Sequence, residues 1–273
     1  VVEPAGPTDP EVGVMALRGP CGGTVGLLSN YALHYIGIPD DHTAFSADYY
    51  GFFSTLIQRL RGESFVAALS NGASGDINNV DVIGNTVRRN DRYQHCERAA
   101  ALVAANALWA WNEAEFTDDP PLGFSLAELT LDACPPPSAE DIAKAQEIEA
   151  RLEAGQKVLM GERSFQRRVR RLEAKPPAPH TTVVQALRIG ELAIVGVPGE
   201  FFVEYGLSTK RNSPFARTMT IELANDWIGY VPTEAGLAQG GYETWLARSA
   251  RVASGAEKLF LDAADDCLSR VAP

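Results

Sequence analysis

The stretch that most constrains the fold of this chain is residues 66–79, where a short apolar run ends abruptly in small and polar residues. Val66 to Leu69 is short, β-compatible and bounded by turn formers, which predicts a buried strand. The dipeptides Asn71-Gly72 and Gly75-Asp76 follow it and are typical of turns. In an α/β sheet, ligands bind at this end of the strands. Taken alone, however, the stretch indicates only a tight connection from strand to loop.

The elements before this stretch predict a βαβ unit. Residues 12–17 and 23–34 are expected to form two strands, separated by the turn Arg18-Gly-Pro-Cys-Gly-Gly23. Residues 47–61 have the helical spacing of apolar side chains. Strand, helix and strand thus follow in order, which favours a partly parallel sheet. We therefore expect an α/β fold with mixed β-sheets flanked by helices.

The rest of the chain continues this alternation of helices and strands. Helices are expected over residues 92–115, 138–175, 201–210 and 255–271, and strands over 123–131, 181–187, 192–197 and 219–223. The two strands around Ile189-Gly-Glu191 read as a hairpin. Ser138-Ala-Glu-Asp141 predicts a capping box at the start of the helix over 138–175, which has a break at Gly155 or Gly161.

The second half of that helix carries five arginines between Arg163 and Arg171, while glutamates precede them. We interpret it as a solvated helical arm packed on one face, and not as a nucleic-acid site. The formal net charge of -11 and the pI of about 4.9 also argue against nucleic acid or an anionic membrane as the main partner.

Length and composition are those of a globular chain. Its 273 residues suffice for one large domain or two small ones. We find no apolar run long enough to span a membrane and no signal peptide, and the initial Val1 indicates a processed or truncated amino terminus. Cys21, Cys96, Cys134 and Cys267 are too scattered for a compact zinc ribbon, which leaves two disulfides or four buried thiols open.

Three predicted strands lead to residues that could bind a metal. His34 ends Asn30-Tyr-Ala-Leu-His34, Glu200 follows Val197-Pro-Gly199, and Tyr230 follows a strand and a turn. Imidazole, carboxylate and phenolate are competent zinc ligands, and an open position that holds water makes such a site catalytic. Each residue also has a structural alternative, as a core histidine, a residue at a helix amino terminus and a packing tyrosine.

Five motifs, in order, resemble those of the neutral and alkaline non-lysosomal ceramidases and their bacterial relatives. They are Asn30-Tyr-Ala-Leu-His34 with Ser46-Ala-Asp48-Tyr-Tyr-Gly51, Phe65-Val-Ala-Ala-Leu-Ser70 with Gly75-Asp-Ile-Asn78, Val197-Pro-Gly-Glu-Phe201, Gly229-Tyr-Val-Pro-Thr-Glu234 and Gly241-Tyr-Glu243. The spacing of twelve residues between Tyr230 and Tyr242 is also that of the family. The resemblance implies that residues 1–273 form a single portion of a ceramidase-like catalytic domain, the carboxyl-terminal part, without the amino-terminal segment.

The same resemblance implies a zinc-dependent hydrolase with His34, Glu200 and Tyr230 as metal ligands. Zinc would acidify a bound water, and the hydroxide would attack the carbonyl of a small or lipid-like N-acyl amide. Tyr242 would donate a hydrogen bond to the developing oxyanion. The loop residues Gly75 and Asp76 are expected to line the substrate site.

Two departures from the family pattern qualify this expectation. No histidine precedes His34, so the fourth zinc ligand of the family is missing; His42, His95 and His180 are expected to be surface residues. An active enzyme would need an amino-terminal fragment of the same precursor as a second chain.

The second departure is Asn78, which stands where ceramidases have a serine; its amide can position a carbonyl or a water but cannot act as a nucleophile. Ceramide itself is therefore doubtful as the substrate. The nearby Ser74 occupies a different point of the turn and is not expected to replace the serine. An esterase on the same metal site and a non-catalytic binding relative stay open as alternatives, and the resemblance suggests a periplasmic or extracellular protein.

Overall fold

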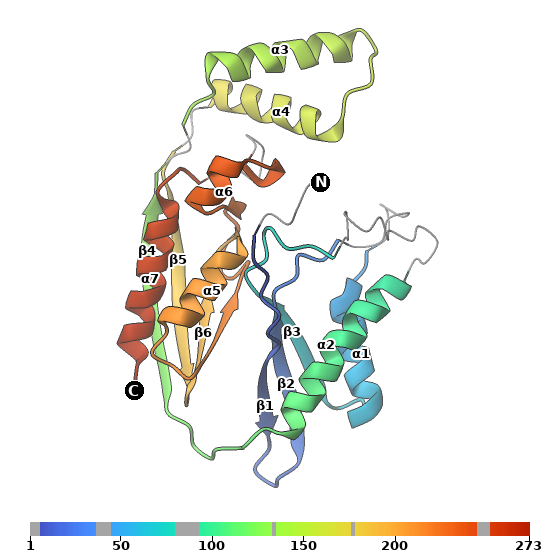
Figure 1. Ribbon diagram of the computed structural model, residues 1–273, viewed down its shortest axis with the longest axis vertical. Helices are drawn as coiled ribbons and strands as arrows, with labels where there is room; N and C mark the ends of the chain where they lie inside the picture. The colour runs from blue at the N-terminus through green and yellow to red at the C-terminus, as the bar shows by residue number, and fades with distance from the viewer. Residues whose placement is uncertain (1–5, 37–44, 80–92, 133–134, 176–177, 245–251) are drawn as a thin grey trace.

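The computed structural model describes residues 6–36, 45–79, 93–132, 135–175, 178–244 and 252–273. Within them, two main β-sheets lie between two pairs of helices, and a helical hairpin stands apart from this body (Figure 1). The expected α/β fold with mixed sheets flanked by helices is confirmed.

The first sheet contains the predicted βαβ unit. Strands β1 (Gly13–Arg18) and β2 (Thr24–Tyr31) are antiparallel, whereas β2 and β3 (Val66–Asn71) are parallel and are connected through helix α1 (Asp48–Arg61). Helix α2 (Gln94–Asn112) packs beside α1 on one face of this sheet. The core between sheet and helices includes Leu27, Phe53, Ile57, Phe65, Val103 and Ala107. Apolar spacing on both helices thus drives this half of the fold.

The second sheet has the order β4-β5-β6-β8 and is also mixed. Strands β4 (Leu122–Leu131), β5 (His180–Ile189) and β6 (Leu192–Gly196) are antiparallel neighbours, and β8 (Arg217–Ile221) runs parallel to β6. The predicted hairpin between β5 and β6 is confirmed, with Gly190 at a φ of +64° in its turn. Helices α5 (Val203–Asn212) and α7 (Ala256–Val271) cover one face of this sheet.

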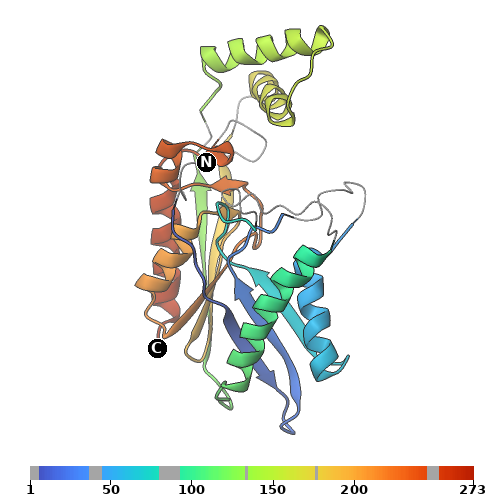
Figure 2. The same ribbon diagram turned by 45° about the vertical axis from the view of Figure 1, so that its right-hand side comes forward.

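The two sheets meet where their parallel strands end. Strand β8 packs against β2 and β3, and the side-chain amide of Asn30 donates to the carbonyl of Thr220 at 2.9 Å. Beyond them lie two short parallel strands, β7 (Glu200–Phe201) and β9 (Tyr230–Val231). Helices α1 and α2 thereby end up on the opposite side of the body from α5 and α7 (Figure 2). The arrangement brings the carboxyl ends of β3, β6 and β8 together, where ligand sites form in such sheets.

The arm over residues 138–175 is a hairpin of two helices, α3 (Ala139–Glu153) and α4 (Met160–Ala174). The predicted capping box between Ser138 and Asp141 is confirmed. The predicted break falls at Gly155, which adopts a φ of +68°, whereas Gly161 lies inside α4. The two helices share a small core of their own, made by Ala145, Ile148, Phe165 and Val169, so the expected packing on one face is also confirmed.

Two further helical segments follow β9, the short helix α6 (Glu234–Gln239) and the 3-10 turn η1 (Tyr242–Thr244). None of the helices in the described ranges is long and apolar enough to cross a membrane. Cys96 and Cys267 are buried free thiols and Cys21 is an exposed one. Cys134 lies outside the described residues. Because the other three are free, the alternative of two disulfides is wrong, and the exposed Cys21 also contradicts four buried thiols.

Candidate metal centre

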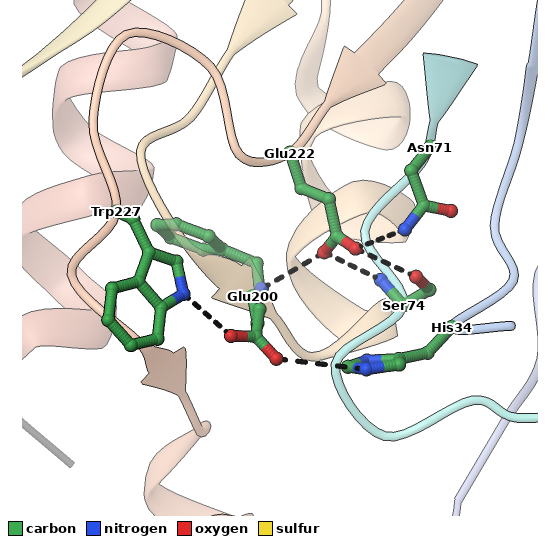
Figure 3. A network of polar contacts seen from close by, with 7 residues as sticks. His34, Asn71, Ser74, Glu200, Glu222 and Trp227 are labelled. Atoms are coloured by element: carbon green, nitrogen blue, oxygen red, sulfur yellow. Dashed lines mark hydrogen bonds and ion pairs between the residues drawn. The ribbon is translucent and has the colours of Figure 1, made fainter. Parts of the chain in front are cut away.

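The three predicted metal ligands lie together in the structure. Nε2 of His34 is 3.7 Å from Oε2 of Glu200, and these side chains point toward each other from opposite sides of the loop that follows β3 (Figure 3). The rings of His34 and Tyr230 are stacked, with centroids 5.8 Å apart and an angle of 19° between their planes. Segments that are far apart in the sequence therefore present an imidazole, a carboxylate and a phenol to one place.

Backbone pairing explains this convergence. Glu200 and Tyr230 are directly paired residues of the parallel strands β7 and β9. A side chain at Gly199 could not fit, because its Cβ would lie 2.6 Å from the carbonyl oxygen of Gly229. His34 is held by its own backbone N–H, which donates to the carbonyl of Ile77 at 2.7 Å. The Pro-Gly-Glu motif therefore serves the close approach of β7 to β9 as well as the position of the carboxylate.

Tyr242 and Trp227 complete the surroundings of these ligands. The ring of Tyr242 meets that of Tyr230 edge to face at 5.7 Å, and Nε1 of Trp227 donates to Oε1 of Glu200 at 2.7 Å. Burial, a hydrogen bond with Tyr242 and the charge of Glu200 raise the pKa of Tyr230. Burial also raises the pKa of Tyr242. Without a nearby cation, both phenols are therefore neutral at pH 7.

Glu222 is a part of this centre that the sequence pattern did not single out. The residue follows β8 and is 3% exposed, and four hydrogen bonds from Asn71, Ser74 and Phe201 reach its carboxylate (Figure 3). Burial outweighs these bonds and raises the pKa of Glu222 to about 8. The one available signal is a carboxylate near the end of an apolar strand, and the strand predicted over 219–223 includes that residue as an ordinary member.

The loop after β3 packs against Glu200 and α5. The N–H of Gly75 donates to the carbonyl of Phe201 at 2.7 Å, and a Cβ at Gly75 would lie 2.5 Å from the carbonyl oxygen of Glu200. Oδ1 of Asp76 accepts from the N–H of Val203 at 2.8 Å, and burial raises the pKa of Asp76 to about 6. These contacts hold the loop in place, whereas the substrate-lining role of Gly75 and Asp76 stays a prediction.

Asn78 lies next to the predicted ligands. It forms an isolated parallel bridge with His34 and is exposed to solvent. The two other described histidines are exposed and paired elsewhere, His95 with the carbonyl of Asn79 at 3.1 Å and His180 with Asp226 at 2.6 Å. Both agree with the expected surface histidines, and His42 lies outside the described residues.

The donor set fits a zinc ion in part. Two atoms bound to one tetrahedral zinc lie about 3.4 Å apart, which is near the observed distance between Nε2 of His34 and Oε2 of Glu200. Nδ1 of His34 is buried without a partner, and no lysine or arginine in the described ranges pairs with Glu200 or Glu222. The largely buried carboxylate of Glu200, without a lysine or arginine partner, favours a positive ion. The described residues nevertheless contain no group of three His, Cys, Asp or Glu that could hold a metal, so the phenol of Tyr230 has to be the third donor.

Comparisons with known proteins bear on the fold. No family model matches the chain, and no curated protein matches its sequence. Among solved structures, the chain is similar to neutral ceramidase from Pseudomonas aeruginosa, with a TM-score of 0.69 and 19% identity over 97% of this chain and 48% of that one. A second structure, a ceramidase complexed with C2, gives a TM-score of 0.69 and 18% identity over 97% of this chain and 49% of that one. The chain thus has the fold of the neutral ceramidase structures over about half of their length, as the sequence motifs led us to expect.

Proposed function

We propose that this chain is the metal-binding part of a zinc-dependent hydrolase that cleaves an N-acyl amide bond. The observation that carries the proposal is the convergence of His34, Glu200 and Tyr230 at the ends of the parallel strands, with 3.7 Å between the imidazole and the carboxylate. The proposal draws its reaction class from the fold shared with the neutral ceramidases. The ligand roles rest on the geometry and on the motifs.

A bound zinc would acidify a water and polarise the carbonyl of the substrate. The protein would supply the remaining functions. The hydrogen bond from Trp227 fixes the orientation of the Glu200 carboxylate. Tyr242, whose raised pKa keeps it protonated at neutral pH, would donate a hydrogen bond to the oxyanion. Asn78, beside His34, would orient the carbonyl or the attacking water through its amide.

A further part of the proposal concerns polypeptide that lies outside this sequence. Three protein ligands and a water suffice for a catalytic zinc, and a histidine from an amino-terminal fragment could be a fourth ligand. The absence of a histidine before His34, where the family motif has its first zinc ligand, motivates the proposal of such a partner. A denaturing gel and intact mass spectrometry of the protein from its natural source would reveal the second chain, and a fractionation experiment would test the proposed periplasmic or extracellular location.

The first experiment is metal analysis of Glu200→Ala beside the wild type. We expect about one zinc per wild-type chain and almost none in the variant, at an unchanged far-UV circular dichroism spectrum, because removal of a ligand acts locally. The matched control is Glu191→Ala, an exposed glutamate in the turn between β5 and β6. Equal zinc content in the wild type and Glu200→Ala would disprove the ligand role.

The reaction class needs a substrate panel. Zinc-loaded wild type, reconstituted with its partner chain if one is found, should hydrolyse N-acyl amides, and Tyr242→Phe should lower kcat by about 100-fold because an oxyanion donor is lost. Hydrolysis of esters alone would favour the esterase alternative. A wild type that retains no zinc would favour a binding relative without catalysis.

A further inference from the structure

We propose that Glu222 is a positioning residue that keeps the carboxylate of Glu200 next to the imidazole of His34. The inference rests on the proposed function, because it takes Glu200 and His34 as metal ligands. Glu222 lies directly after Ile221, the last residue of strand β8.

The carboxylate of Glu222 connects three segments of the site. Its Oε2 accepts hydrogen bonds from the backbone N–H groups of Ser74 and Phe201, both at 3.2 Å. Its Oε1 accepts from the side-chain amide of Asn71 at 2.6 Å and from the hydroxyl of Ser74 at 2.9 Å. One buried side chain thereby joins the end of β3, the loop that follows it and the strand that carries Glu200.

Phe201, the residue after Glu200, is held by hydrogen bonds at both its backbone N–H and its backbone carbonyl. Its N–H donates to Glu222, and its carbonyl accepts from the N–H of Gly75 in the same loop. The carboxyl group of Glu222 and the hydrogen bonds that it accepts, which we call the clamp, therefore fix the backbone next to Glu200. Backbone that is fixed from both sides limits how far a metal-ligating side chain can move.

The same loop also holds His34. The N–H of His34 donates to the carbonyl of Ile77, three residues after Ser74. The turn from Ser74 to Ile77, in which the N–H of Ile77 donates to the carbonyl of Ser74 at 2.9 Å, thus connects Glu222 at one end with His34 at the other. We infer that the separation of 3.7 Å between imidazole and carboxylate depends on this connection.

The number of donors favours a carboxyl group, with its two oxygens, at this position. Four donors meet at its two oxygens, and a buried donor without an acceptor is costly. Glutamine can turn its single oxygen to the two backbone N–H groups, and its amide nitrogen can donate to the hydroxyl of Ser74, so that only the Asn71 amide loses its acceptor. Alanine leaves all four donors without their acceptor. Glutamine therefore preserves the side-chain volume and most of these hydrogen bonds, whereas alanine removes both, and a separate cavity variant is needed to report the effect of lost volume alone.

The experiment compares Glu222→Ala, Glu222→Gln and a control, Val184→Ala, which opens a cavity in the core of the second sheet and removes none of the four hydrogen bonds to Glu222. Zinc affinity is measured by competition with a chromogenic chelator, and Tm is measured on the metal-free proteins. We expect the dissociation constant for zinc to rise about 10- to 100-fold in Glu222→Ala and to stay within about threefold of wild type in Glu222→Gln. Val184→Ala should lower Tm and leave zinc affinity unchanged.

A purely structural role for Glu222 would lower Tm in Glu222→Ala without changing zinc affinity, and this result would overturn the inference. If that variant does not fold, Ser74→Ala removes a single donor to Oε1 and should weaken zinc binding by a few-fold; unchanged affinity there would overturn it as well. A wild type that binds no zinc would refute the proposed function together with the inference. Loss of zinc in Glu200→Ala but not in Glu222→Ala would refute the inference alone.

Discussion

Gly75 lies where the loop after β3 passes closest to the backbone of Glu200. A Cβ there would lie 2.5 Å from the carbonyl oxygen of Glu200, and backbone on both sides leaves little room for relaxation. We expect Gly75→Ala to lower the free energy of unfolding by about 1–3 kcal/mol, as overpacking does, and to weaken zinc binding. Urea denaturation measures the first effect. Gly23→Ala is the control, because its Cβ would meet no atom within 4 Å; equal stability of the two variants would contradict the prediction.

Glu222 also makes the stability of the metal-free protein depend on pH. Its folded-state pKa of about 8 lies above its ordinary value of 4.5, so between these values the folded protein binds a proton that the unfolded chain has released. The contribution of Glu222 to stability is thus complete below pH 4.5 and is lost as the pH rises through 8. A difference of one between the folded and unfolded pKa values corresponds to about 1.4 kcal/mol, so the total loss amounts to a few kcal/mol.

Urea denaturation of metal-free protein between pH 6 and pH 8 tests this dependence, because the raised pKa of Asp76, about 6, places its own loss below that range. We expect the free energy of unfolding of the wild type to fall with pH, and that of Glu222→Gln to change much less, since glutamine does not titrate. Parallel pH profiles for the two proteins would assign the dependence to another group.

At the scale of elements, the arm of α3 and α4 has a hydrophobic core separate from those of the two sheets. Phe165 is 8% exposed and packs in that core with Ile148 and Val169. We expect Phe165→Ala to destabilise the arm by about 3 kcal/mol and to leave the body intact. Hydrogen exchange should then accelerate over 139–174 while α7 keeps its protection.

Arg163→Ala is the matched control for the arm, because Arg163 is exposed on α4. It should leave exchange over the arm unchanged. If Phe165→Ala also accelerated hydrogen exchange in β5 or α7, the arm and the body would unfold together, contrary to the prediction.

The long elements were predictable because their apolar side chains repeat with a helical or strand period. The short strands β7 and β9 were not, since two residues carry no period. Tyr230 was nevertheless expected after a strand and a turn, on the strength of the motif around it. A break of the arm at Gly155 or Gly161 was predictable from the glycines, whereas the choice of Gly155, which has a φ of +68°, came from the structure.

At the scale of the whole molecule, the second sheet leaves an apolar stretch of its edge strand uncovered. Leu122, Phe124 and Leu126 alternate along one face of β4 and are 76%, 64% and 41% exposed. Phe124 is paired with Leu187 of β5, so apolar side chains continue across the face. Contiguous exposed apolar surface of this kind promotes association.

We therefore expect Phe124→Gln to reduce both self-association and the binding of a hydrophobic dye, without loss of Tm. Light scattering coupled to size-exclusion chromatography and dye fluorescence measure the two effects. Leu60→Gln is the control, because Leu60 is 71% exposed on helix α1. A Phe124→Gln protein that behaves like this control would show that the face takes no part in association.

The sequence by itself determined the order of the long helices and strands, the βαβ unit and the three candidate ligands His34, Glu200 and Tyr230, because periodicity, turn chemistry and short motifs are local properties of a chain. Only the tertiary structure decided which strands are neighbours across the two sheets, and therefore that Glu222 clamps Phe201 to the loop after β3. A hydrogen bond between residues 148 positions apart leaves no periodic trace in the sequence. The stretch from Val66 to Asn79, which its own residues predict only as a strand with a polar end, is thus the connection between the two halves of the site.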